Sequence, residues 1–162
     1  MKFSFKRIGV LVFILSCFSN PVFAEGNSAE ATATAKMRVI QRLSLENKSD
    51  LIFPDAYPGD PLGIVRPTEK NAAFFDVNGQ TGLSYVVNFP AQSIFLTTAG
   101  AGNIADRRIL VFDFKTDLTN NIGRLESGKS NFRVGASRAA LRPTQVISNE
   151  YQGKFLVRVN YL

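Results

Sequence analysis

Short segments of β-forming residues recur along the chain, and each is followed within a few residues by Gly, Pro, Asn, Asp or Ser. Several of these segments alternate apolar and polar residues with a period of two. No stretch has the length and the 3.6-residue apolar period of an amphipathic helix. The pattern therefore predicts an all-β fold, an antiparallel Ig-like β-sandwich of about 7–9 strands. The expected strands are residues 31–45, 51–53, 63–66, 72–77, 83–89, 93–97, 107–116, 132–135 and 153–162.

Two of these segments carry more specific predictions. Asn78-Gly79 lies between residues 72–77 and 83–89, and Asn-Gly between apolar runs is typical of a β-hairpin. Residues 107–116 alternate regularly and are expected to form a central strand. If that strand is unbroken, its two faces consist of Leu110, Phe112 and Phe114, and of Val111, Asp113 and Lys115.

Residues 135–143, GASRAALRP, leave two structures open. Ser, Arg and Ala can form one helical turn that Pro143 ends, or the segment can be a solvated strand or loop. Arg133, Arg138 and Arg142 would form a basic patch if all three were exposed.

The first 24 residues have the layout of a secretory signal peptide. A basic start is followed by a short apolar run and by Val22 and Ala24 at the small-residue positions of a cleavage site. The run is too short to span a bilayer. We therefore expect an exported mature chain, residues 25–162, that forms a single domain without a transmembrane span. An alternative is a lipoprotein box at 14–17 with a lipidated Cys17, although Leu15 is bulky for such a box.

The residues that are absent exclude much catalytic chemistry. The chain has no His, and its one Cys lies in the signal peptide, so Ser-His-Asp and Cys-His nucleophiles are impossible. Ordinary zinc and transition-metal sites lack their ligands. Paired carboxylates would suffice for a glycosidase, but no acidic pair is singled out by spacing. We expect no enzymatic activity, no metal site and no cofactor.

Two further ligand classes are disfavoured. Residues 100–105 match the G-x-G-x-x-A pattern, but a strand-like segment follows where a dinucleotide site requires a helix. Residues 100–105 are therefore expected to form a glycine loop between strands. The net charge of +6 falls once the basic signal peptide is removed, so it does not indicate nucleic-acid binding.

The two ends of the mature chain alternate in different ways. One face of the terminal segment is strongly apolar, so we expect it to pack into the core as a centrally paired strand. The corresponding face of the start is made mainly of small alanines, which bury little area. Such a segment can be the first strand of its own sheet, or it can add to the sheet of another subunit. The faces are Ala29, Ala31, Ala33, Ala35, Met37 and Val39 at the start, and Phe155, Val157, Val159 and Tyr161 at the end.

With these features the mature chain resembles the bacterial domain-of-unknown-function family 4402. The matching stretches are ATATAKMRVIQRLSL, DLIFPDAYPGDP, AAFFDVNGQTGLSYVV, FRVGASRAAL and YQGKFLVRVNYL. That family is similar to spore coat protein U and to pilins of the archaic chaperone–usher type. The resemblance implies a pilin-like Ig fold, with residues 29–39 as an N-terminal donor strand. It also implies an aromatic residue near the end of the last strand, a position that Tyr161 occupies.

Two functions follow as expectations. The first is a structural or adhesive surface subunit whose partners are itself or related subunits, joined by β-strand addition. The resemblance adds a periplasmic chaperone as a further partner. The second is a monomeric periplasmic or secreted binding module, in which Tyr57, Tyr85 and Tyr151 would contact glycans or peptides. Both place the protein in the periplasm, at the cell surface or outside the cell.

Overall fold

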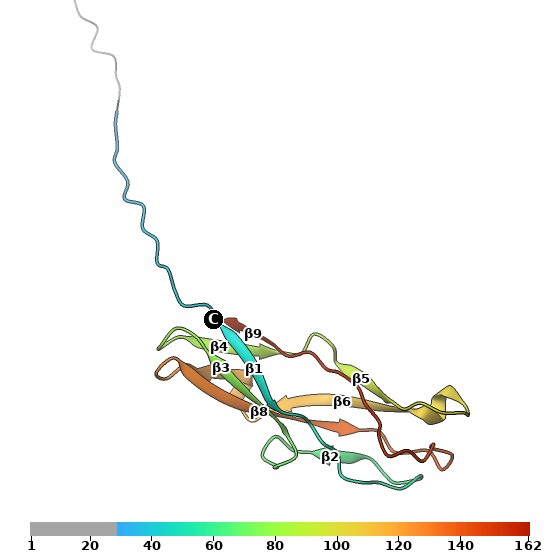
Figure 1. Cartoon of the computed structure of the whole chain (residues 1–162). Coiled ribbons are helices and arrows are strands. Elements are labelled where there is room, and N and C mark those ends of the chain that lie inside the picture. Colours follow the sequence, from blue (N-terminus) through green and yellow to red (C-terminus); the bar gives the residue numbers. More distant parts are fainter. Residues whose placement is uncertain (1–28) are drawn as a thin grey trace, which may run out of the picture. The chain divides into compact units, whose positions relative to one another are not determined.

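The computed structural model describes residues 29–162, and the predicted signal peptide with Cys17 lies outside the described residues. The chain divides into two units, one that ends at Met37 and one that runs from Arg38 to Leu162. In the first unit, residues 29–37 contain no helix or strand, and they are exposed. The second unit contains all the strands of the described chain (Figure 1).

This second unit is an antiparallel β-sandwich, which confirms the predicted fold class. Its strands are β1 (Ser44–Ser49), β2 (Gly63–Val65), β3 (Ala73–Asn78), β4 (Ser84–Asn88), β5 (Ser93–Thr97), β6 (Arg108–Thr116), β7 (Ile122–Arg124), β8 (Lys129–Arg138) and β9 (Arg158–Tyr161). The larger sheet has the order β1-β3-β8-β6-β5, with β2 also paired to β8. The smaller sheet has the order β7-β4-β9. Two short 3₁₀ helices, η1 (Ile104–Arg107) and η2 (Thr119–Asn121), flank β6.

The core lies between the two sheets and is built around aromatic rings. Phe75 of β3 and Phe132 of β8 stack with their ring centroids 5.3 Å apart. Tyr85 of β4 faces them from the smaller sheet, 6.4 Å from the centroid of Phe132. Burial alternates along β3, as expected for a strand with one face in the core. The buried core cluster consists of Ala73, Phe75, Val77, Tyr85, Val87, Leu125, Phe132, Val134 and Val157.

A β-bulge in β6 overturns the predicted faces of this strand. Phe112 pairs with Ser137, but Lys115 pairs with Gly135, so the register shifts between them. Asp113 has a φ of 57° at this point. A bulge inserts one extra residue and therefore moves the following side chains to the opposite face. Ile109 and Val111 are buried before the shift, and Phe114 packs against the core after it.

The predicted hairpin at Asn78-Gly79 was wrong. β3 belongs to the larger sheet and β4 to the smaller one, so the connection crosses the sandwich. Gly79 is required here for another reason, because a Cβ atom at this position would collide with the hydroxyl of Tyr161. The turn residues marked the end of a strand correctly, but they did not specify its partner.

The predicted first strand, residues 31–45, was also misplaced. β1 begins only at Ser44 and continues to Ser49, and residues 29–42 are exposed. The alanine face supplies little burial, whereas Leu45 packs against the core cluster. Residues 51–53, expected to be a strand, form none, although the Ile52 N–H donates to the carbonyl of Asn71 at 2.9 Å.

The open question at residues 135–143 is settled by β8, which continues through Arg138. Arg138 is only 8 % exposed, and its guanidinium donates to the carbonyls of Pro61 and Ala139. Because Arg138 is buried, the alternative of an exposed basic patch of Arg133, Arg138 and Arg142 does not hold. Arg133 instead lies over the ring of Phe74, 4.9 Å from its centroid.

Most of the remaining strand predictions agree with the structure, but β7 was not predicted, and the strand expected at 132–135 is only the middle of the longer β8. β5 has the predicted bounds, and β2, β3 and β4 agree to within one or two residues at each end. The short helix η1 begins at Ile104, within residues 100–105, and β6 follows it from Arg108, so the strand expected after the glycine loop is confirmed.

Candidate functional site

The terminal strand β9 is positioned by β4. Val159 pairs with Val87 and Tyr161 pairs with Tyr85, in antiparallel register. β4 is paired on its other side with β7, so β9 lies at the end of the smaller sheet. Among residues 29–162, no strand pairs with the outer edge of β9. The expectation of a centrally paired terminal strand was therefore wrong.

The segment before β9 explains why the strand is short. Gln152 forms an isolated bridge with Thr97 of β5 in the larger sheet, with N–O distances of 2.8 and 3.0 Å. Residues 153–157 then join this bridge to the smaller sheet and belong to no strand. The predicted ten-residue strand is therefore four residues long, because its first half runs between the sheets.

The apolar face predicted at residues 155–161 does pack on the core. Phe155 stacks on Phe114 with centroids 5.0 Å apart and meets Phe75 edge to face at 6.4 Å. Val157 is 9 % exposed. Val159 and Tyr161 are partly buried against the same cluster. The face was thus identified correctly, although its strand has an open edge.

Tyr161 fastens the end of β9 to two other segments. Its hydroxyl donates to the carbonyl of Gln41 at 2.8 Å and accepts from the N–H of Gln80 at 2.7 Å. The N–H of Gln41 in turn donates to the side chain of Gln80 at 3.2 Å. This cluster holds the residues just before β1 beside the end of β9, and β1 and β9 are each a terminal strand of their sheet (Figure 1).

Many hydrophobic side chains near β1 and β9 are only partly buried. Nine buried residues form the core cluster, and as many hydrophobic residues packed against it are only partly buried. Several belong to β9, to the segment before it, or to β1 and its neighbours. The partly buried set is Leu43, Leu45, Leu51, Phe89, Phe114, Leu118, Phe155, Val159 and Tyr161.

The alternating N-terminal residues are exposed and unpaired within the described chain. Met37 is 88 % exposed and Val39 81 %. The alanines of the same face are exposed as well, and no described strand includes any of these positions. The six residues are Ala29, Ala31, Ala33, Ala35, Met37 and Val39.

Two of the three tyrosines expected at a ligand have structural roles instead. Tyr85 is fully buried and donates to Ser130 Oγ at 2.9 Å. Tyr151 is partly buried and donates to the carbonyl of Val146 at 2.6 Å. Only Tyr57, which is 79 % exposed, remains available for contact.

The buried Tyr85 hydroxyl makes the stability of the fold depend on alkaline pH. Its pKa is raised from 10.0, chiefly because burial disfavours the phenolate. The folded state therefore retains the proton at pH values where the unfolded chain loses it. The resulting stability is complete below the unfolded pKa and is lost as pH rises through the folded pKa.

We expect the free energy of unfolding, measured with urea, to fall as the pH is raised above about 10. The variant Tyr85→Phe should reduce this decline, because it has no proton to lose. Tyr57→Phe is the matched control at an exposed site and should retain the decline. Equal slopes for all three proteins would contradict the assignment to Tyr85.

Two other kinds of site are not found in the described part of the chain. Residues 29–162 contain no group of three or more metal-binding side chains near one another. Within the same residues, no helix is long and apolar enough to cross a membrane.

Comparisons with known proteins gave no match to a family model, a curated protein or a solved structure.

Proposed function

We propose that this chain is an exported, non-enzymatic structural or adhesive surface subunit that assembles by β-strand addition. In this proposal residues 29–39 are the added strand, and the outer edge of β9 in a second copy or a related subunit receives it. The observation that carries the proposal is the open edge of β9 beside a partly buried apolar layer. An unpaired edge presents N–H and C=O groups that another strand can satisfy.

The open edge offers a short length of backbone pairing. At about 3.3 Å per residue, the four residues of β9 (Arg158–Tyr161) extend over roughly 13 Å, so about four residues of the segment 29–39 can pair with them. Main-chain hydrogen bonds would supply much of the affinity along this length.

The chemistry of the added strand also suits the receiving edge. Small alanines can pack against the partly buried side chains of Phe155, Val159 and Leu45. Glu30, Lys36 and Arg38 would remain on the opposite, solvated face.

The test is a pair of proline substitutions in the mature chain 25–162. Thr32→Pro combined with Ala35→Pro removes two N–H donors that point to opposite sides of an extended strand. Both residues lie outside the described strands, so the sandwich should remain intact. Thr32→Ser with Ala35→Ser is the control that retains both donors.

Light scattering after size exclusion should show multimers for the parent and the serine variant, and monomers for the proline variant. The multimers should survive SDS and dissociate on boiling. Circular dichroism should show the same fold in all three proteins. Multimers of the proline variant would overturn the proposal. Monomers in every case would favour the monomeric binding module.

A further inference from the structure

A hollow of about 410 Å³, which we call the β5–β6 hollow, opens on the exposed face of β5 and β6. Phe95 of β5 pairs with Leu110 of β6, so the two side chains share this face. The neighbouring Val111 points to the opposite face and is buried. The remaining walls come from η1 and from residues 139–145, which follow β8.

Most of the surface that lines the β5–β6 hollow is apolar and open to solvent. The side chain of Phe95 is 52 % exposed and that of Ile104, in η1, is 56 % exposed. Leu110, Ala139 and Ala140 continue this wall. An apolar ligand placed here would therefore remove substantial apolar area from water, which favours binding.

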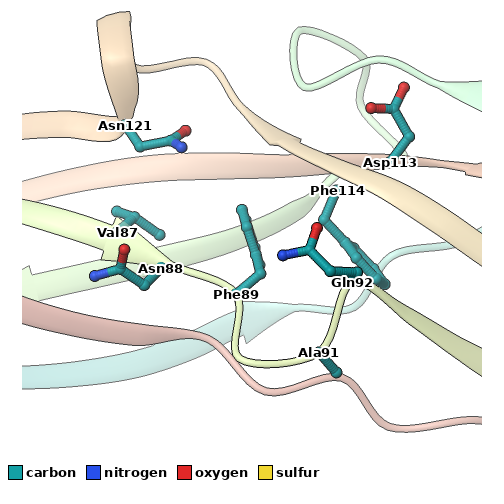
Figure 2. A pocket seen from close by; sticks show the side chains of 8 residues that line it. All are labelled: Val87, Asn88, Phe89, Ala91, Gln92, Asp113, Phe114 and Asn121. Carbon is teal, nitrogen blue, oxygen red and sulfur yellow. The ribbon is translucent and has the colours of Figure 1, made fainter.

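The hollow at the end of β4, shown in Figure 2, differs in this respect. Phe89 and Phe114 line it, and their rings stack with centroids 5.6 Å apart. Because the rings cover each other, polar atoms form most of the lining that is left open. A ligand with an apolar body can bury more apolar surface in the β5–β6 hollow.

The charged residues that line the β5–β6 hollow are two arginines, and no acidic residue lines it. The guanidinium of Arg108 lies over the ring of Phe95, 5.7 Å from its centroid, and within residues 29–162 it forms no ion pair. Arg142 is 3.9 Å from Asp106 Oδ1, which also accepts from Thr144 at 2.9 Å. An exposed pair of that length is weak, so both arginines can take an anion.

A buried glutamine holds the walls of the β5–β6 hollow together. Gln145 is 7 % exposed and lines the hollow. Its Nε2 donates to the carbonyl of Asp106 at 2.7 Å and to that of Arg108 at 3.4 Å. The segment that carries Ala140 and Arg142 is thereby fixed to the start of β6. A site whose walls are already in place loses less entropy when a ligand binds.

We propose that the β5–β6 hollow binds a small carboxylate with an apolar body, such as a one-ring aromatic acid. A guanidinium presents a planar fork of N–H donors that matches a carboxylate. With the carboxylate at Arg108, the apolar body lies against Ile104 and Leu110. The volume falls within the range of small-molecule sites, about 300–1,000 Å³.

An extended peptide is the less suitable ligand, because the neighbouring edge of β5 is already covered. Thr97 bridges Gln152 there. Gly153 lies so close to β5 that a Cβ atom on it would be 2.5 Å from the carbonyl oxygen of Phe95. A peptide that adds to a sheet needs an open edge. No lining residue belongs to β9 or to residues 29–39, so this proposal is independent of the proposed assembly.

The experiment is a saturation-transfer NMR titration of the mature chain 25–162 with 3-phenylpropanoate. The method observes the ligand, so it works for monomers and multimers alike. Saturable binding is expected, with a dissociation constant in the millimolar range. The neutral 3-phenylpropanamide, the cationic phenethylamine and inorganic phosphate should each bind at least about fivefold more weakly, because each lacks either the negative charge or the apolar body.

Two matched pairs of variants locate the site. Arg108→Gln should weaken binding at least about fivefold, whereas Arg124→Gln, at an exposed arginine of β7, should leave it unchanged. Ile104→Thr should also weaken binding, and Ile147→Thr, at a residue that is 87 % exposed and outside the lining, should not. Circular dichroism checks that every variant is folded.

Three outcomes would overturn the proposal: no saturable binding of 3-phenylpropanoate, equal or tighter binding of the amide, the amine or phosphate, or undiminished binding by the Arg108→Gln variant. None of them depends on whether the chain forms multimers, so failure here is distinguishable from failure of the proposed assembly.

Discussion

Replacing Gly135 with alanine is expected to lower the free energy of unfolding by about 3 kcal/mol, near the upper end of the range for overpacking. A Cβ atom at this position would collide with the carbonyl oxygen of Val65 and lie 2.6 Å from the nitrogen of Pro67. These are backbone atoms, which cannot rotate away. Gly135 is also buried and paired with Lys115 of β6, so the strand cannot shift without breaking that ladder.

Urea unfolding provides the measurement. With a slope of about 1–3 kcal/mol/M, the midpoint should fall by roughly 1–3 M. Gly82→Ala is the control, because Gly82 has a φ of 81° but no atom within 4 Å of the added Cβ. Its cost should be about 1–2 kcal/mol, from backbone strain alone. A Gly135 variant that is no less stable than this control would contradict the close approach of β2 to β8.

Replacing Tyr161 with alanine is expected to cost about 2–4 kcal/mol, below the cost of removing a fully buried aromatic ring. The ring is partly buried against the core, and its hydroxyl joins Gln41 and Gln80. Both contributions are lost together. Because the hydroxyl holds the end of β9, the same variant should weaken the edge that we propose receives the added strand.

Tyr161→Phe separates the ring from the hydroxyl. It keeps the packing and removes two hydrogen bonds, so it should cost about 1–2 kcal/mol. Tyr57→Phe, at a position 79 % exposed, should leave the stability unchanged. Thermal and urea unfolding of the three variants give these differences directly. A Tyr161→Phe protein as stable as its parent would mean that the hydroxyl does not fasten the terminal strand.

The elements that were predicted well are those whose local pattern and tertiary environment agree. β5 and β6 are rich in β-branched and aromatic residues, and both appear close to their expected bounds. The apolar face at residues 155–161 was likewise correct, since Phe155 and Val157 pack on the core. A period of two reports which residues share a face without knowledge of the partner strand, provided that no bulge interrupts the strand as it does in β6.

The candidate sites were predictable only in part. The alternating segments at both ends were visible in the sequence, but the open edge of β9 depends on strand order. One feature of the tertiary structure left a signal in the sequence: Asp113 is a polar turn-former inside an apolar strand, which is where the β6 bulge forms.

The sequence by itself determined the all-β class, most of the strand positions, and the absence of histidine and cysteine chemistry in the predicted mature chain. These properties depend on local periodicity and composition. Only the tertiary structure decided that Asn78-Gly79 crosses between sheets, that Asp113 reverses the faces of β6, and that β9 has a free edge. Each of these depends on which strands pair, and pairing is a competition among distant segments for the same hydrogen bonds and the same core.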